Sequence, residues 1–244
     1  MIVNNVAKDI YYIENVIANP LSVLDTIEFS DKNPDLWSII PQWQDWILRD
    51  IYNKIEFKSD EIKGYRKTFN WDGYGCTCPE DWKWNDVDIN ATPVHKKCYD
   101  EIIKPIEDAL LKVLGVWSEV TDNPIPSRIS RNYELQKYNP GGGLDVHQDL
   151  DFRFSKSENM DWTLLIYFND NYEGGELRFS DHDIKIKPSA GSAFLFKTSE
   201  MHQGMPVISG QKTMIMWYIS IKHSLVLGAG QQFVNILRRL NKSY

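Results

Sequence analysis

The second half of the chain consists of short β-rich segments, and this pattern restricts the possible folds more than any other feature. From about residue 128 onward, stretches such as WTLLIYF, SAFLF and KTMIMWYISI alternate with turn-forming stretches such as NPGGG and PSAG. Val, Ile, Tyr, Phe and Trp favour strands, whereas Gly, Pro, Asn and Asp favour turns. We expect about eight strands in this region, a number and spacing typical of a β-sandwich or barrel.

The first half of the chain has a different pattern, which predicts helices. Pro20 can open a short helix, and apolar residues recur at helical spacing between residues 43 and 51. Thr92 is a suitable N-cap and Gly115 a suitable end for the clearest helix. The predicted helices therefore cover 20–29, 43–51, 92–116 and the C-terminal stretch 225–244, and a long aromatic loop covers 69–91.

Composition excludes several classes of partner. A net charge of −7 and a pI near 5.3 argue against a surface that binds nucleic acid, which is normally basic. No stretch approaches the roughly 18 continuous apolar residues of a membrane span. Three cysteines without a secretory leader favour a reducing compartment. We therefore expect a soluble cytoplasmic protein with no nucleic-acid or membrane partner and leave its oligomeric state open.

His147 and Asp149 stand two residues apart, just after the three glycines of NPGGG. On an extended chain this spacing puts both side chains on one face. Such a pair is more often a polar surface feature than a metal site. A third ligand is available in His202, because a closed barrel can bring distant strands face to face. Two histidines and one carboxylate form the facial triad of non-haem Fe(II) oxygenases.

Lys212 stands ten residues after His202, at the start of an apolar strand. A lysine in such a strand is costly unless it meets an anion. It can hold a carboxylate of a cosubstrate that binds the open metal positions. The ordinary alternative is a lysine on an edge strand that extends its ammonium group to water.

Four sequence blocks resemble the 2-oxoglutarate- and Fe(II)-dependent dioxygenases, within them the prolyl 4-hydroxylase-like group. The similarity covers residues 131–221, and order, spacing and residue type agree in every block. The blocks are YNPGGGLDVHQD, LLIYFNDNYEGGELRF, IKPSAGSAFLF and HQGMPVISGQK. The resemblance implies an α+β fold class with a double-stranded β-helix (jelly-roll) core over 128–224. From the pattern of the chain we expect residues 1–127 to supply helical and strand support within the same functional domain. The alternative is a separate N-terminal domain, for which the sequence shows no linker.

The resemblance also implies roles for individual residues. His147, Asp149 and His202 match the Fe(II) ligands. The residues that match the cosubstrate pocket are Lys212, which pairs with the distal carboxylate of 2-oxoglutarate, Tyr138 and Thr163.

Two positions depart from the family pattern. Leu144 stands where the family often has an aromatic residue, and Trp217 follows Lys212 by five residues instead of six. On a strand this difference puts Trp217 on the opposite face. The first departure bears on the substrate pocket and leaves the metal ligands unaffected.

The function implied is hydroxylation of an unactivated C–H bond, with prolyl residues of a peptide or protein as the expected substrate. The cofactors implied are Fe(II), 2-oxoglutarate and O2, with ascorbate as an optional addition, and the products are succinate and CO2. A retained Asp149 favours hydroxylation over halogenation. The alternatives are hydroxylation of another residue or a free amino acid, a non-catalytic jelly-roll binding or sensor domain, and a cupin-type metal isomerase, which would not need Lys212.

A second metal site can be drawn from the cysteines. Cys76 and Cys78 precede His95 and Cys98, and the last two would share a helical face. Four such ligands can hold a structural zinc ion. The Cys-x-Cys spacing is tighter than that of common zinc fingers. Ordinary buried or free cysteines are therefore the main alternative.

Overall fold

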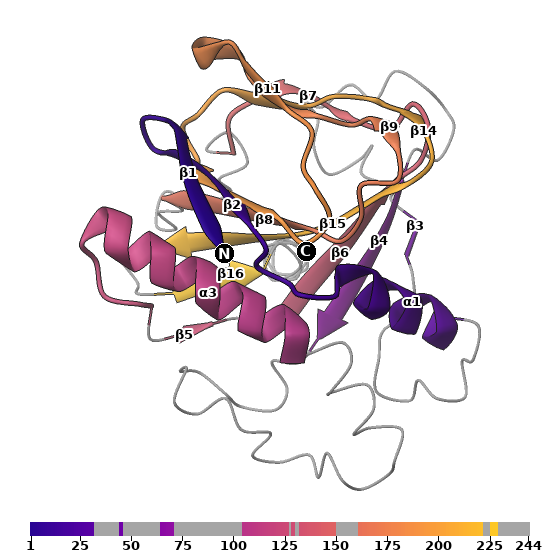
Figure 1. The fold of residues 1–244 in the computed structure, drawn as a ribbon, viewed down its shortest axis with the longest axis horizontal. Helices are drawn as coiled ribbons and strands as arrows, with labels where there is room; N and C mark the ends of the chain where they lie inside the picture. Colours follow the sequence, from indigo (N-terminus) through magenta and orange to yellow (C-terminus); the bar gives the residue numbers. More distant parts are fainter. Residues whose placement is uncertain are drawn as a thin grey trace, which may run out of the picture.

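Strands dominate the computed structural model of the chain, and most of them form two largely antiparallel sheets that face each other (Figure 1). The structure describes residues 1–31, 44–45, 64–70, 104–126, 128–129, 132–149, 161–221 and 225–228. In these residues no helix is long and apolar enough to cross a membrane.

The larger sheet has ten strands and runs from the N-terminus to the last described residues. Its main path is β1-β2-β12-β8-β15-β6-β4-β3; off this path, β16 pairs with β15, and β5 pairs with β16 in parallel. The bounds are β1 Ile2–Ala7, β2 Ile10–Glu14, β3 Gln44–Asp45, β4 Gly64–Asn70, β5 Arg128–Ile129, β6 Asn132–Tyr138, β8 Trp162–Tyr167, β12 Ala193–Lys197, β15 Lys212–Ser220 and β16 Leu225–Gly228. Strands from before and after residue 128 therefore share one sheet.

The smaller sheet lies across the larger one and has the order β11-β10-β13-β7. Its strands are β7 Leu144–His147, β10 Leu177–Phe179, β11 Ile184–Ile186 and β13 His202–Gly204, and the short turn η6 Ser180–His182 joins β10 to β11. A third pair, β9 Glu173–Gly174 and β14 Val207–Ser209, lies beside it. Two facing antiparallel sheets fit the jelly-roll core that the sequence predicts.

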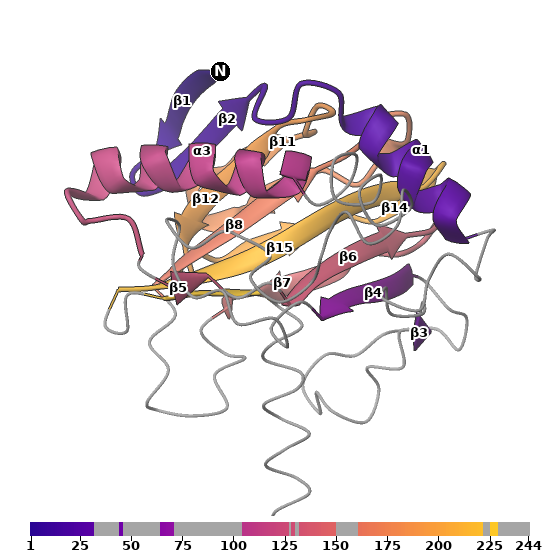
Figure 2. The same cartoon turned by 90° about the horizontal axis from the view of Figure 1, so that it is seen from below.

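Strand alternation divides the larger sheet into two apolar faces. Along β15, Ile215, Trp217 and Ile219 point to one face, while Met214 points to the other. The first face packs against helix α3 Lys104–Thr121, which lies across the sheet (Figure 2). The second face closes against the small sheet and forms the interior where the site residues lie.

Helix α3 differs from the predicted helix over 92–116. It continues through Gly115 to Thr121, so the prediction that Gly115 ends it is wrong. The apolar stripe explains the difference, because Val116 and Trp117 are buried in the core beyond the glycine. That burial outweighs the modest cost of glycine inside a helix. Pro105 lies in the first turn of α3, where its missing N–H breaks no helical bond.

Other predicted elements agree only in part. Helix α1 Pro20–Asp31 lies where it was predicted, with proline at its first position. Gln44–Asp45 forms strand β3, which contradicts the helix predicted over 43–51 at these two residues. The predicted loop begins inside β4, which continues to Asn70. Leu225–Gly228 forms strand β16, so a C-terminal helix cannot start at residue 225. The supporting helices are therefore not confirmed as a set.

Alanine substitutions at two glycines, Gly191 and Gly115, are expected to change the stability of the protein in opposite directions. Gly191 has a φ of +76°, and a Cβ there would lie 2.6 Å from the carbonyl oxygen of Ile17. A Cβ at Gly115 meets nothing within 4 Å. We expect Gly191→Ala to destabilise the protein by at least about 2 kcal/mol. Gly115→Ala should stabilise it by about 0.5–1 kcal/mol. Urea unfolding measures both changes, and a loss of stability in the Gly115 variant would contradict this account of α3.

Candidate functional site

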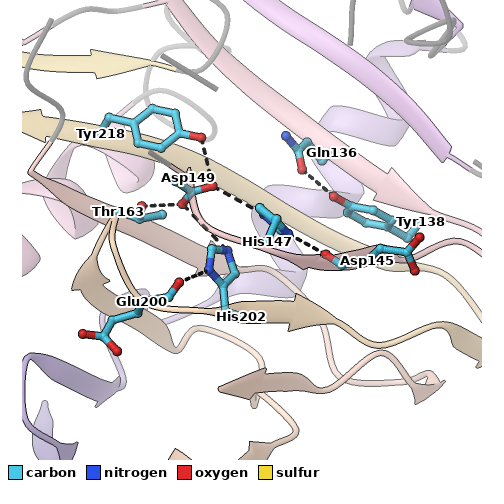
Figure 3. Close-up of polar contacts among 9 residues, drawn as sticks. All are labelled: Gln136, Tyr138, Asp145, His147, Asp149, Thr163, Glu200, His202 and Tyr218. Atoms are coloured by element: carbon cyan, nitrogen blue, oxygen red, sulfur yellow. Dashed lines mark hydrogen bonds and ion pairs between the residues drawn. The ribbon is translucent and has the colours of Figure 1, made fainter. Parts of the chain in front are cut away.

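Three side chains with metal-binding atoms meet in the interior between the two sheets. His147 on β7 and His202 on β13 are directly paired across antiparallel strands, and Asp149 follows β7 by two residues. Their candidate ligand atoms all lie within 4.8 Å of one another. His147 Nε2 is 3.5 Å from Asp149 Oδ1, and His202 Nε2 is 3.7 Å from Asp149 Oδ2 (Figure 3). The structure thus brings together the three residues that the sequence singled out.

The glycine run before His147 lets β7 dock beside β13. A Cβ on Gly143 would lie 2.8 Å from the carbonyl oxygen of Gly204, closer than real Cβ contacts. Gly141 donates a backbone hydrogen bond to Val207, and Val207 donates one to Gly142. The glycines are therefore needed for a close backbone approach, which sets the position of His147.

Both histidines are held in the tautomer that a metal requires. His147 Nδ1 lies 2.6 Å from the carbonyl oxygen of Asp145, and His202 Nδ1 lies 2.9 Å from that of Glu200. A carbonyl oxygen only accepts, so each Nδ1 carries the hydrogen and each neutral ring has its lone pair on Nε2. The Nε2 atoms face Asp149 (Figure 3).

The charge states also suit a cation. Burial lowers the pKa of His202, although nearby Asp149 acts in the opposite direction, so the ring is neutral near pH 7. Burial raises the pKa of Asp149, but the two histidines and the hydroxyl of Thr163 outweigh burial and bring the pKa below its ordinary value. A neutral imidazole and an ionised carboxylate are the forms that bind metals.

The Asp149 carboxylate has two hydroxyl neighbours on the large sheet. Thr163 Oγ1 donates to Asp149 Oδ2 at 2.5 Å. The Tyr218 hydroxyl lies 3.5 Å from Asp149 Oδ1, a long contact. The sequence predicted a pocket role for Thr163, which stays a prediction; the partner of its hydroxyl here is Asp149.

Lys212 is a buried cation with few partners. It is 3% exposed, and its Nζ donates to the carbonyl oxygen of Gly175 at 3.2 Å. The ring of Tyr138 lies 4.6 Å from Nζ. The burial of Lys212 on β15, between β8 and β6, excludes the alternative of an edge-strand lysine that reaches water. In the described part of the chain no carboxylate forms an ion pair with Lys212. An unpaired buried ammonium needs an anion.

Tyr138 and Trp217 lie as the strand pattern requires. Tyr138 pairs with Lys212 across β6 and β15, and its hydroxyl donates to Gln136 Oε1 at 2.7 Å. Trp217 points to the opposite face of the sheet from the site and packs on the core beneath α3. Whether Tyr138 contacts a cosubstrate stays a prediction. Cys76, Cys78, His95 and Cys98 lie outside the described residues, so the zinc hypothesis is not tested.

Two tyrosines of this interior were not singled out from the sequence. Tyr218 stands six residues after Lys212, where the resembled family usually has tryptophan. Tyr167 lies on β8 among the interior residues, and no hydrogen bond from its hydroxyl is found in the described ranges. Burial raises the pKa of Tyr167, so its hydroxyl stays protonated and can donate. Alternation along LLIYF, counted from Thr163, is the signal that could have found Tyr167.

Comparisons with known proteins agree with this geometry. A model of the 2OG-Fe(II) oxygenase superfamily matches residues 133–220. A PKHD-type hydroxylase of Shewanella baltica is 37% identical over 115 residues, which are 45% of this chain and 49% of that protein. A PKHD-type hydroxylase of Maricaulis maris is 29% identical over 96 residues, 38% of this chain and 43% of that protein. The chain thus spans about half the length of these curated relatives.

A solved structure also aligns with this chain. The 2OG complex of viral collagen prolyl hydroxylase vCPH from Paramecium Bursaria Chlorella virus-1 has a TM-score of 0.49 and 17% sequence identity with this chain. The alignment covers 87% of this chain and 95% of the viral protein.

Proposed function

We propose that this protein is a dioxygenase that uses Fe(II), 2-oxoglutarate and O2 to hydroxylate an unactivated C–H bond, because a model of the 2OG-Fe(II) oxygenase superfamily matches residues 133–220. The observation that carries the proposal is the convergence of His147, Asp149 and His202 within 4.8 Å, in the interior that also holds the buried Lys212. The metal triad and the cosubstrate cation are thus both available on facing sheets.

The donor set fits Fe(II). His147 and His202 offer one imidazole nitrogen each and Asp149 offers one carboxylate oxygen, which is the composition of a facial triad with open positions. Fe(II) bound there supplies the oxidising chemistry with O2 and 2-oxoglutarate. These are the same three ligands that the sequence predicts.

Other residues of the interior bind 2-oxoglutarate or keep water away from the site. Lys212 pairs with the distal carboxylate of 2-oxoglutarate, and Tyr167 donates to the same end of the cosubstrate from the neighbouring strand β8. The ring of Tyr138 covers the Lys212 ammonium. Phe196 packs 4.7 Å from the His202 ring, between centroids, and keeps water from that side of the site. The attraction between the Lys212 ammonium and the carboxylate is stronger in this buried interior than in water, so it orients the cosubstrate.

The pKa of Lys212 gives a pH prediction. Burial lowers this pKa to about 8, and the charge of Glu176 acts in the opposite direction. Only the ammonium form attracts a carboxylate, so binding is strongest below the pKa and declines as the pH rises through it. We expect 2-oxoglutarate affinity to fall by about tenfold per pH unit above roughly pH 8.

Isothermal titration between pH 7 and 10 measures this decline, with Lys212→Arg as the control. A guanidinium stays charged over the whole range, so the arginine variant should show a flat profile even if its affinity is lower. Parallel profiles for the two proteins would contradict the role of Lys212.

The proposed substrate is a prolyl residue of a peptide or protein. Support comes from the four sequence blocks that resemble the prolyl 4-hydroxylase-like group, and from the relatives named hydroxylases. The rival within the same chemistry is another residue or a free amino acid. The rival outside it is a binding or sensor domain that keeps the fold without turnover.

A product screen separates these possibilities. The Fe(II)-loaded protein is incubated with 2-oxoglutarate, O2 and a peptide library, alongside the same library with proline replaced by alanine and a panel of free amino acids. A mass gain of 16 Da confined to the proline peptides, with matching succinate, supports the proposal. A gain in the other pools indicates a different substrate, and no succinate in any pool favours the non-catalytic rival.

A further inference from the structure

The described residues show what holds the central carboxylate of the site. Asp149 is 2% exposed, and its side chain lies against the inner face of the large sheet. Thr163 on β8 and Tyr218 on β15 are directly paired across antiparallel strands. Both are buried, and each hydroxyl points toward a different carboxylate oxygen of Asp149 (Figure 3).

Asp149 needs such support because strand pairing does not provide it. His147 and His202 are each fixed by a backbone carbonyl two residues earlier in the chain. Asp149 lies beyond the last residue of β7. Without the two hydroxyl groups its carboxylate would be free to rotate, and its lone pairs would not face the two Nε2 atoms reliably.

We propose that Thr163 and Tyr218 form a hydroxyl clamp that positions the Asp149 carboxylate for metal binding. Thr163 is the stronger member, since its Oγ1 lies 2.5 Å from Oδ2, while the Tyr218 hydroxyl lies 3.5 Å from Oδ1. Thr163 is thus a positioning residue, a role that differs from the cosubstrate role expected from the sequence. The inference rests on the proposed function, because it presumes a metal at the triad.

Metal affinity tests the clamp without any need for turnover. Mn(II) is titrated into the apo-protein and free Mn(II) is followed by electron paramagnetic resonance, for wild type, Thr163→Val and Thr163→Ser. Valine has nearly the same shape as threonine but lacks the hydroxyl, whereas serine keeps it. We expect Thr163→Val to raise the Kd for Mn(II) by about 10- to 100-fold, the usual effect of losing an outer partner of a ligand. Thr163→Ser should stay within about threefold of wild type.

A matched control separates positioning from folding. Thr213 is a buried threonine on β15, next to Lys212, with its side chain on the opposite face of the sheet. Thr213→Val makes the same chemical change away from Asp149 and should leave the Kd for Mn(II) unchanged. Thermal unfolding of each apo-protein reports stability separately. If the role of Thr163 were only structural, Thr163→Val would lower the unfolding temperature and leave the Kd for Mn(II) unchanged.

Each outcome has one meaning. If Thr163→Val binds Mn(II) within about twofold of wild type, the clamp is overturned while the metal site stands. If wild type itself does not bind Mn(II), the proposed function is wrong, and the clamp, which presumes a metal at the triad, is wrong with it. If Thr163→Val does not fold, Tyr218→Phe replaces it as the test. That variant should weaken binding by a smaller factor, about two- to tenfold, and an unchanged Kd would overturn the clamp.

Discussion

Replacing His202 by alanine is expected to abolish turnover. The variant removes one of two imidazole ligands, and its neighbour Asp149 would then bind the metal with His147 alone. Losing an outer partner of a ligand typically costs 10- to 100-fold, so losing a ligand should reduce activity by on the order of a thousandfold or more. Succinate release, measured at saturating Fe(II) and 2-oxoglutarate, gives the activity directly.

The control for this variant is Gln203→Ala. Gln203 follows His202 on the same strand, and alternation points its side chain to the other face of the small sheet. We expect this protein to keep activity within about twofold of wild type. The assignment of the triad would be wrong if the His202 variant, with Fe(II) present, turned over at a rate near that of wild type.

Replacing Lys212 by methionine is expected to weaken the binding of 2-oxoglutarate and to stabilise the apo-protein. Methionine keeps the apolar length of the side chain but removes the ammonium, so the distal carboxylate of 2-oxoglutarate loses its partner. Breaking such a buried pair costs about 3–5 kcal/mol, which corresponds to a rise in the KM for 2-oxoglutarate of at least about a hundredfold. The KM comes from initial rates of succinate release as 2-oxoglutarate is varied.

The same variant should make the apo-protein more stable. Lys212 is 3% exposed and lacks an ion pair in the described residues, so its burial is unfavourable before the cosubstrate binds. Thermal unfolding of the apo-protein should therefore occur at a higher temperature in Lys212→Met than in wild type. The surface variant Lys197→Met, which removes a partly exposed ion pair with Asp9, should change neither quantity appreciably. An unchanged KM in the Lys212 variant would refute its role.

The strands of the core could be predicted because their apolar residues have clear periods. Along β15 the residues Lys212 and Trp217 were placed on opposite faces from their spacing alone, and the structure has them so. The end of α3 could not be predicted in this way. Gly115 is a strong local stop signal, and only the core under Val116 and Trp117 shows why the helix continues.

The candidate metal triad could be predicted from the sequence because four sequence blocks resemble the dioxygenase family, whereas the spacing of His147 and Asp149 alone is a weak signal. The supporting contacts of the triad could not be predicted. The bond from Thr163 to Asp149 depends on the register between β8 and β15 and on how the end of β7 crosses them, which no local pattern encodes. Tyr167 likewise looked like one more strand residue, since its place in the interior is visible only when the two sheets are brought together.

The most direct test of the central claim is an anaerobic titration of the apo-protein with Fe(II) and 2-oxoglutarate, followed by visible absorption. If the protein is a dioxygenase, a charge-transfer band appears only when both are present, and it disappears on addition of O2 with formation of succinate. The His202→Ala protein should show no band under the same conditions. A folded, metal-loaded wild-type protein that shows no band would contradict the dioxygenase assignment and favour a binding or sensor domain.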